Sequence, residues 1–256
     1  IALDKSFHGR TMATLTATAQ EAMHNYFFPF NEGFVYCGKD IEEIKKQEGV
    51  CAVMLEFIQG EGGVIPQNKQ FIAQVYDYCK KSDILFIADE VQTGVGRTGK
   101  FLCSEHYGVH PDITTLAKGL GGGLPVGAML VGEKCENVMG AGTHGSTFGG
   151  NPVVCAGGKY VLSRIDEKLL EEVAAKGEYI KSRLEGVKGV KSVSGLGLML
   201  GIELDGKKAA DVVKECIAKG VIPLTAKDRV RLLPPLVITM EQLARAMDVL
   251  VEVLGG

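Results

Sequence analysis

The stretch Ile84–Glu90, ILFIADE, constrains the fold more than any other part of the sequence. Five consecutive apolar residues without polar alternation are typical of a strand buried on both faces, as in a parallel sheet. A second apolar run covers residues 50–58, and residues 68–82 begin at a good N-cap, Asn68, and repeat apolar residues at helical spacing. A strand, a helix and a strand in this order predict a parallel sheet with helices on both faces.

The same alternation continues through the following part of the chain. Further strands are predicted at residues 112–118 and 127–132, and a helix at 151–165 has a proline in its first turn. These patterns predict an α/β fold with a large domain over residues 1–165, built on a mostly parallel sheet.

The C-terminal part has a different character. Residues 167–186 form a long, charged amphipathic pattern, followed by short apolar runs. Further helical patterns occur near residues 209–219 and over residues 240–254. This alternation predicts a small α+β domain over residues 166–256.

Composition excludes several classes of function. The chain has 256 residues, 46% hydrophobic and 23% charged, so it can bury a sizeable core. Its net charge of -3 leaves no basic stripe for nucleic acid, and no run of 18 apolar residues predicts a membrane helix. The 7 cysteines are scattered without a CxxC pair, which favours a reducing, cytoplasmic setting over disulfides or a metal site.

Three motifs resemble known ligand sites but fail on context. GVGRTGKF, residues 94–101, matches a phosphate-binding loop except that Phe101 stands where Ser or Thr is needed. GLGGGLPVG, residues 119–127, leads into a strand rather than a helix, which argues against a dinucleotide site. HYGVH, residues 106–110, has two histidines at i, i+4 spacing, but its glycine and the proline that follows oppose a helix. We therefore expect no metal.

Two chemically active residues stand at the ends of predicted strands, Asp89 and Lys118. The carboxyl ends of parallel strands meet at one edge of a sheet, where open α/β sheets bind ligands. A buried carboxylate that holds a pyridinium nitrogen, together with a lysine amine, is the arrangement that a pyridoxal phosphate enzyme needs. A simpler alternative stays open for each residue: Asp89 could cap a turn, and Lys118 could be a solvated lysine in a loop.

The glycines after Lys118 bear on its role. Four of the five residues that follow it are glycine. Glycines let a backbone approach a ligand closely and adopt positive φ. A lysine in a tight, apolar, glycine-lined site has a lowered pKa and becomes a usable nucleophile. We therefore expect Lys118 to lie in such an enclosed site.

Six sequence blocks, taken together, are specific. They are SFHGRT, LEFIQGEGGVIP, FIADEVQTGVGRTGKF, PDITTLAKGLGGGLPVGA, HGSTFGGNP and RLLPPLVIT, in this order along the chain. From its first residue to its C-terminus the chain resembles the class III aminotransferases of pyridoxal-phosphate fold type I, and most closely those that act on acetylornithine or ornithine. Members of this family carry a further N-terminal region before the first block, so we expect the large domain to be N-terminally incomplete here.

The resemblance implies roles for individual residues. Lys118 would hold pyridoxal 5'-phosphate as a Schiff base and move a proton, and Asp89 would pair with the pyridine nitrogen. Phe7 would stack on the ring, Gln92 would bond its hydroxyl edge, and Thr147 would reach the cofactor phosphate of a neighbouring subunit. The implied cofactor-binding residues are Phe7, Asp89, Glu90, Val91, Gln92, Lys118 and Thr147. The implied substrate-binding residues are Arg10, Glu61, Ser146 and Arg231.

The resemblance also implies a reaction and a partner. The δ-amino group of N2-acetylornithine, or of a similar ω-amine, would pass to 2-oxoglutarate in arginine biosynthesis. The contact of Thr147 with a neighbouring subunit implies a homodimer with shared active sites. Three alternatives stay open: an ornithine or succinylornithine donor, a 4-aminobutyrate donor, or an inactive fragment that only dimerises.

Overall fold

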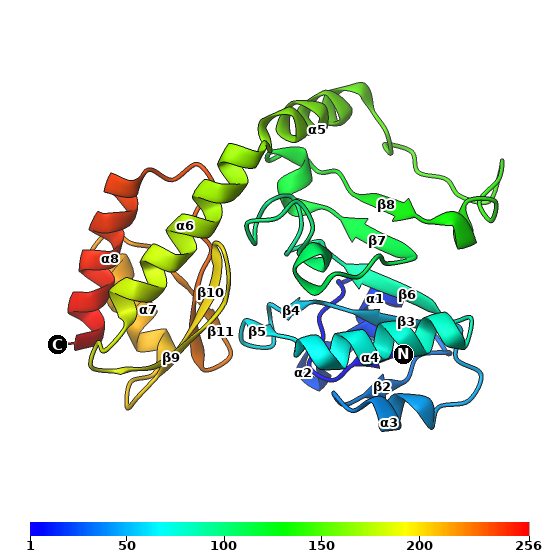
Figure 1. Ribbon diagram of the computed structural model, residues 1–256, viewed down its shortest axis with the longest axis horizontal. Helices are drawn as coiled ribbons and strands as arrows, with labels where there is room; N and C mark the ends of the chain where they lie inside the picture. Colours follow the sequence, from blue (N-terminus) through cyan, green and yellow to red (C-terminus); the bar gives the residue numbers. More distant parts are fainter. Residues whose placement is uncertain (256) are drawn as a thin grey trace. The chain divides into compact units, whose positions relative to one another are not determined.

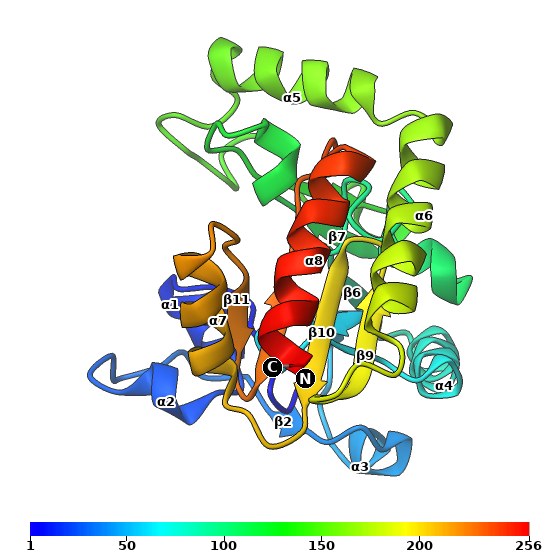
Figure 2. The ribbon, with the colours of Figure 1, turned by 90° about the vertical axis from the view of Figure 1, so that its left-hand side faces the viewer.

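The computed structural model describes residues 1–255, which form two compact units (Figures 1 and 2). Unit 1 contains Ile1–Phe57, Gln67–Val95 and Leu102–Arg164, and unit 2 contains Ile58–Pro66, Gly96–Phe101 and the chain from Ile165 onward. Two short segments that precede the predicted boundary after residue 165 therefore lie within unit 2. Each unit is described by itself below.

Unit 1 is built on a six-stranded sheet with the order β2-β1-β3-β6-β7-β8. The strands are Ala2–Leu3 (β1), Tyr36–Cys37 (β2), Ala52–Leu55 (β3), Leu85–Asp89 (β6), Ile113–Leu116 (β7) and Ala128–Val131 (β8). Neighbouring strands are parallel, except that β8 runs antiparallel to β7. The chain between β7 and β8 contains only the 3-10 helix Lys118–Gly121 (η2), and without a crossover helix it cannot return to start a parallel strand.

The helices of unit 1 are Met12–Ala17 (α1), Glu21–His24 (α2), Ile41–Lys45 (α3), Lys69–Lys81 (α4) and Pro152–Arg164 (α5), with 3-10 helices at Cys103–Tyr107 (η1), η2 and Glu133–Cys135 (η3). Helix α4 confirms the helix predicted over residues 68–82. The side chain of Asn68 accepts hydrogen bonds from the N–H groups of Gln70 and Phe71 and so caps its N-terminus. Its apolar stripe is buried, at Phe71, Ile72, Val75 and Cys79.

The strands of unit 1 are shorter than the apolar runs that predicted them. The run over residues 50–58 contains β3, which ends at Leu55, and then Ile58–Gln59 (β4), which belongs to unit 2. Strand β7 ends at Leu116, so Lys118 opens η2 instead of closing the strand. An apolar run shows that a segment is buried but not where it leaves its sheet.

Unit 2 contains an antiparallel sheet with the order β11-β12-β10-β9. Its elements are Glu167–Leu184 (α6), Val190–Leu196 (β9), Met199–Leu204 (β10), Ala209–Ala218 (α7), Leu224–Ala226 (β11), Arg229–Leu232 (β12) and Met240–Gly255 (α8). Strand β4 pairs with Ile65–Pro66 (β5) in a separate antiparallel hairpin. These elements match the helices and short strands predicted for the C-terminal part.

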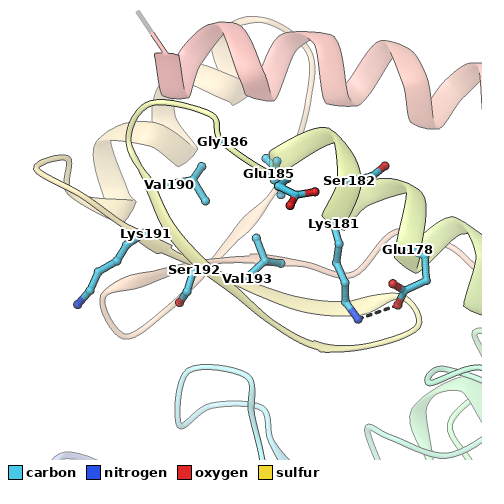
Figure 3. A pocket seen from close by; sticks show the side chains of 10 residues that line it. Glu178, Lys181, Ser182, Glu185, Gly186, Val190, Lys191, Ser192 and Val193 are labelled. Carbon is cyan, nitrogen blue, oxygen red and sulfur yellow. Dashed lines mark hydrogen bonds and ion pairs between the residues drawn. The ribbon is translucent and has the colours of Figure 1, made fainter.

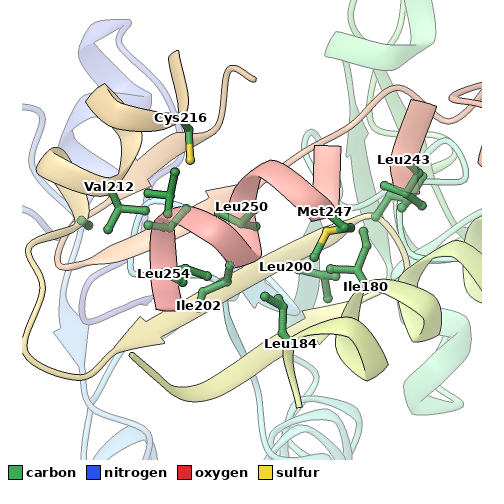
Figure 4. Packing of buried hydrophobic residues seen from close by; sticks show 14 of the residues in the cluster. Ile180, Leu184, Leu200, Ile202, Val212, Cys216, Leu243, Met247, Leu250 and Leu254 are labelled. Atoms are coloured by element: carbon green, nitrogen blue, oxygen red, sulfur yellow. The ribbon is translucent and has the colours of Figure 1, made fainter. Parts of the chain in front are cut away.

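The core of unit 2 lies between one face of this sheet and its three helices (Figure 4). Leu200 and Ile202 of β10 are fully buried on that face. Figure 4 shows Leu200 beside Ile180 of α6, and Ile202 beside Leu254 of α8. Gly201 lies between the two β10 residues and belongs to the opposite face, because side chains alternate along a strand. The sheet thus has one apolar face and one face free for other contacts.

Within residues 1–255, no helix is long and apolar enough to cross a lipid bilayer. The described residues also contain no group of three or more His, Cys, Asp and Glu side chains placed to hold a metal ion.

Candidate active site

Asp89 is the last residue of β6, at the carboxyl end of the parallel part of the sheet. Its carboxylate is nearly fully buried, with 7% of the side chain exposed. Oδ1 accepts hydrogen bonds from the N–H of Val91 at 3.1 Å and from Oγ1 of Thr115 at 3.3 Å. A buried carboxylate is stable only where donors or cations meet it, and these donors fix the orientation of Asp89.

His8 is a partner of Asp89 that the sequence analysis missed. Its Nδ1 lies 2.7 Å from Oδ2 of Asp89, and its side chain is 0% exposed. The N–H of His8 donates to Oγ1 of Thr18, which fixes the backbone of the FHGR block. With Nδ1 donating to the carboxylate, His8 gives Asp89 a third hydrogen bond, from a segment far away in the sequence. The signal was its place between Phe7 and Arg10, both singled out from the sequence.

Lys118 follows β7, the neighbour of β6, at the same edge of the sheet as Asp89. It has φ 43°, a left-handed conformation that costs a residue with a side chain about 1–3 kcal/mol. Its side chain is exposed, so the enclosed, apolar surroundings that we predicted for Lys118 are wrong for the described residues. The glycines that flank it carry no side chains that could cover it.

The structure gives the neighbouring glycines a packing role. A Cβ at Gly122, which has φ +60°, would lie 2.7 Å from Cγ2 of Val161 in α5. A Cβ at Gly121 would lie 2.9 Å from Cγ1 of Val126. Glycine is required at both positions because η2 packs closely against α5 and against the segment that follows η2. This packing fixes the position of Lys118, the first residue of η2.

The residues after Asp89 divide between two tasks. Oε1 of Gln92 is buried and has no hydrogen-bond partner among the described residues. Glu90 is fully buried and accepts hydrogen bonds from Oγ1 of Thr93 and from the N–H groups of Cys103 and Ser104. Burial raises the pKa of Glu90, and these hydrogen bonds oppose the increase. Glu90 therefore fixes the backbone at Cys103 and Ser104, whereas Oε1 of Gln92 can accept a hydrogen bond from a ligand.

The other site residues expected in unit 1 lie on two surface segments. Phe7 is partly buried, and its N–H donates to Oε2 of Glu56 at 2.9 Å. Arg10 is exposed, with its guanidinium 5.6 Å from the centre of the Phe7 ring. Ser146 and Thr147 are exposed in the loop before α5.

Glu61 and Arg231 lie together in unit 2, although 170 residues separate them in the sequence. Nη1 of Arg231 donates to Oε1 of Glu61 at 2.5 Å, and their side chains are 10% and 30% exposed, in that order. Nε of Arg231 is buried and has no partner among the described residues. Arg231 thus has donor capacity beyond its ion pair.

The rejected phosphate-loop motif has a structural role in unit 2. Arg97 is largely buried, and its Nη1 donates to the carbonyl oxygens of Leu198 at 3.0 Å and Pro234 at 2.6 Å. Burial lowers the pKa of Arg97 to about 10. This arginine ties the segment Gly96–Phe101 to the loop that follows β12.

A surface pocket of about 420 Å³ lies between α6 and β9 (Figure 3). Its charged lining is already paired in part, since Nζ of Lys181 lies 2.8 Å from Oε1 of Glu178. None of the residues singled out from the sequence lines this pocket. Because the pocket contains no candidate site residue, the candidate site remains at the edge of the unit 1 sheet.

Comparison with known proteins decides the family. The family model described as aminotransferase class-III matches residues 1–254. The chain belongs to the class III aminotransferases. An acetylornithine aminotransferase of Haemophilus ducreyi is 48% identical over 260 residues, which cover 100% of this chain and 66% of that protein.

Solved structures of the family agree with the fold. The ornithine aminotransferase of Toxoplasma gondii has a TM-score of 0.92 at 32% identity and is matched over 99% of this chain and 63% of its own. The N-acetylornithine aminotransferase of Stenotrophomonas maltophilia has a TM-score of 0.78 at 32% identity, with 88% and 63% covered. In another structure of the Toxoplasma enzyme, pyridoxal phosphate partly occupies the active site. The predicted α/β aminotransferase fold is confirmed, and this class III chain spans about two thirds of the length of its relatives.

Proposed function

We propose that the protein is a pyridoxal-phosphate-dependent aminotransferase that moves the δ-amino group of N2-acetylornithine to 2-oxoglutarate, a step of arginine biosynthesis. The observation that carries this proposal is the 48% identity to an acetylornithine aminotransferase across the whole chain. The buried Asp89 at the sheet edge, beside the strand that leads to Lys118, supports it.

The residues of unit 1 fit pyridoxal phosphate. Asp89 offers a buried carboxylate that its donors hold in one orientation, which suits a protonated pyridine nitrogen. Gln92 offers a buried acceptor, Oε1, that no described residue uses, which suits the hydroxyl edge of the ring. Lys118 offers a primary amine at the same sheet edge. Asp89, Gln92 and Lys118 thus supply an anion, a hydrogen-bond acceptor and an amine, the three groups that the cofactor needs.

The bound cofactor supplies an electron sink that lets an amino group leave one substrate and pass to the next. The carboxylate of Asp89 would face the pyridine nitrogen, and Nδ1 of His8 keeps this carboxylate in one orientation. Nζ of Lys118 would take the proton from the donor carbon that bears the amine and pass it to the bound cofactor. In the second half-reaction it would move a proton in the opposite direction, onto the carbon of 2-oxoglutarate that receives the amino group. Phe7 would pack against the ring, and Arg10 would bind a carboxylate of the donor.

Unit 2 supplies the selection between the two substrates. Arg231 binds the α-carboxylate of 2-oxoglutarate through its guanidinium, which is a geometry suited to carboxylates. Glu61 covers Arg231 while the ω-amine donor reacts, because that donor has no carboxylate beside its reacting carbon. The 2.5 Å ion pair is the covered state.

Ornithine is the second candidate donor. The Toxoplasma ornithine aminotransferase matches 99% of the chain with a TM-score of 0.92, but its 32% identity is below the 48% of the acetylornithine relative. The candidates differ in the amine that they accept as donor. The test is therefore turnover of the full-length protein with acetylornithine, succinylornithine, ornithine and 4-aminobutyrate. We expect the highest kcat/KM with acetylornithine. A higher value for another amine identifies that amine as the donor. A protein that neither absorbs visible light nor turns over any amine is not an active aminotransferase.

Borohydride reduction of the holoenzyme is expected to fix the cofactor on Lys118. Trypsin does not cleave after a modified lysine, so the labelled peptide should span residues 101–134, with Lys118 inside it. Mass spectrometry of the digest checks this. Lys100 and Lys134, which bound that peptide, serve as internal controls, and label on either of them contradicts the proposed role of Lys118.

Mixing two inactive variants is expected to restore activity if active sites are shared. A dimer of Thr147→Ala with Lys118→Ala has one site with both residues intact and one with neither. Because about half of the dimers in an equal mixture are hybrids, we expect about a quarter of wild-type activity after subunit exchange. Activity that stays at the level of the separate variants places Thr147 in the site of its own subunit.

A further inference from the structure

A row of paired residues crosses the sheet of unit 2 at Arg231. Gly201 of β10 pairs with Arg231 of β12 on one side and with Ser194 of β9 on the other. Residues that pair across antiparallel strands point to the same face of a sheet. Ser194, Gly201 and Arg231 therefore share the face opposite the apolar core, with Gly201 in the middle.

The turn that carries Glu61 is seated on this row. It joins β4 to β5 and contains Gly60, Glu61, Gly62, Gly63 and Val64. A Cβ added to Gly201 would lie 2.8 Å from Cβ of Val64 and 2.9 Å from the carbonyl oxygen of Gly63. The turn occupies the space that a side chain at Gly201 would need.

Ser194 ties the same turn down at its other end. Oγ of Ser194 donates to the carbonyl oxygen of Val64 at 2.7 Å and accepts from Nη1 of Arg229 at 2.9 Å. Nη2 of Arg229 is held by Oε2 of Glu203 at 2.8 Å. Because Arg229 donates to the hydroxyl oxygen, the Ser194 proton is directed away from it, and the Val64 carbonyl at 2.7 Å is a nearer acceptor than that of Gly201 at 3.4 Å.

The turn needs a tether because its backbone is strained. Val64 is fully buried and has φ 56°, where a β-branched residue is a clear outlier. Strain of this kind persists only where surrounding contacts fix it. Inside the turn, the N–H groups of Gly63 and Val64 donate to the carbonyl oxygen of Gly60 at 3.3 and 3.2 Å.

We propose that Ser194 is the positioning residue of the Glu61–Arg231 pair, acting through the Val64 carbonyl on the turn that carries Glu61. Arg229 orients the Ser194 hydroxyl, Ser194 fixes the base of the turn, and Glu61 at its tip stays within reach of Arg231. The effect on substrate choice rests on the proposed function, whereas the tether itself does not.

Hydrogen exchange of the full-length holoenzyme tests the tether without using activity. In Ser194→Ala the amides of Gly63 and Val64 should exchange about five- to tenfold faster, because one oriented hydrogen bond to the turn is lost. Ser194→Thr keeps the hydroxyl and should restore slow exchange. Ser182→Ala is the matched control: this serine of unit 2 lies in α6, and its Oγ donates to the carbonyl oxygen of Tyr179 in the same helix (Figure 3 shows its place). Exchange that is unchanged in Ser194→Ala, or equally fast in Ser182→Ala, overturns the proposal.

The ratio of reaction at the α-amine of glutamate to reaction at the δ-amine of acetylornithine provides the second readout. In Ser194→Ala this ratio should rise about three- to tenfold, since Glu61 covers Arg231 less firmly, and Gly201→Ala should shift it in the same direction by displacing the turn. Should Glu61→Ala leave the ratio unchanged while Ser194→Ala still speeds exchange, the proposed selection by the ion pair fails and the tether stands. A ratio that rises in Ser182→Ala as much as in Ser194→Ala contradicts the positioning role.

Discussion

Replacing Asp89 with Asn is expected to lower kcat by about two to four orders of magnitude. The change keeps the shape of the side chain but removes the charge that faces the pyridine nitrogen. Removing one member of a buried charge pair costs about 3–5 kcal/mol, which corresponds to about 10²–10⁴ in rate. Steady-state kinetics with acetylornithine and 2-oxoglutarate measure it, and the visible spectrum should show that part of the cofactor still binds.

Two further variants distinguish the effect of the Asp89 charge on kcat from the effect of changes elsewhere in unit 1. His8→Gln removes the ring whose Nδ1 lies 2.7 Å from the carboxylate, but leaves the charge in place, so a smaller loss of kcat is expected. Asp112→Asn is the matched control, because this aspartate of unit 1 accepts a hydrogen bond from the N–H of Phe86 and has no role in the site. Near-normal turnover in Asp89→Asn makes the carboxylate a purely structural group.

The part of the fold that the sequence predicted well depends on local pattern. Helix α4 and strand β6 follow from apolar spacing, an N-cap and a continuous apolar run, all of which lie within a few residues. The antiparallel direction of β8 was not predictable in this way, because apolar runs have no direction. It follows from the short connection after β7, which has no crossover helix.

The candidate site shows the same limit. Asp89 and Lys118 could be proposed because each stands at the end of an apolar run. The contact between His8 and Asp89 spans 81 residues, and no spacing rule connects a histidine to a carboxylate over that distance. The exposure of Lys118 was mispredicted because glycine-rich sequence indicates close backbone packing, which here occurs against α5, and does not say what covers the lysine.

Glu61 and Arg231 solve a physical problem that the two substrates create. Acetylornithine presents a δ-amine with no carboxylate beside the reacting carbon, whereas 2-oxoglutarate presents one next to it. An uncovered arginine favours the second kind of substrate and leaves a buried cation unpaired with the first. The carboxylate of Glu61, at 2.5 Å from Arg231 and on a turn rather than a strand, is a partner that can be exchanged for the keto acid.

Replacing Glu61 with Ala is expected to leave Arg231 open to carboxylates at all times. Reaction at the α-amine of glutamate should then gain relative to reaction at the δ-amine of acetylornithine. Single-turnover rates of the two half-reactions measure the ratio. Glu61→Gln keeps the size of the side chain without its charge, so a gain in that variant as well attributes the effect to charge.

Replacing Arg231 with Ala is expected to damage one half-reaction much more than the other. The 2-oxoglutarate half loses the cation that binds its α-carboxylate, a loss of about 2–3 kcal/mol or about 30- to 150-fold in kcat/KM. The acetylornithine half loses only the partner of Glu61 and should fall less than about tenfold. Arg183→Ala removes another arginine of unit 2, which bonds Tyr179 of α6 and Asp248 of α8, and should not reproduce this asymmetry. If Arg231→Ala and Glu61→Ala instead slow both half-reactions equally, the pair stabilises unit 2 and has no part in choosing between substrates.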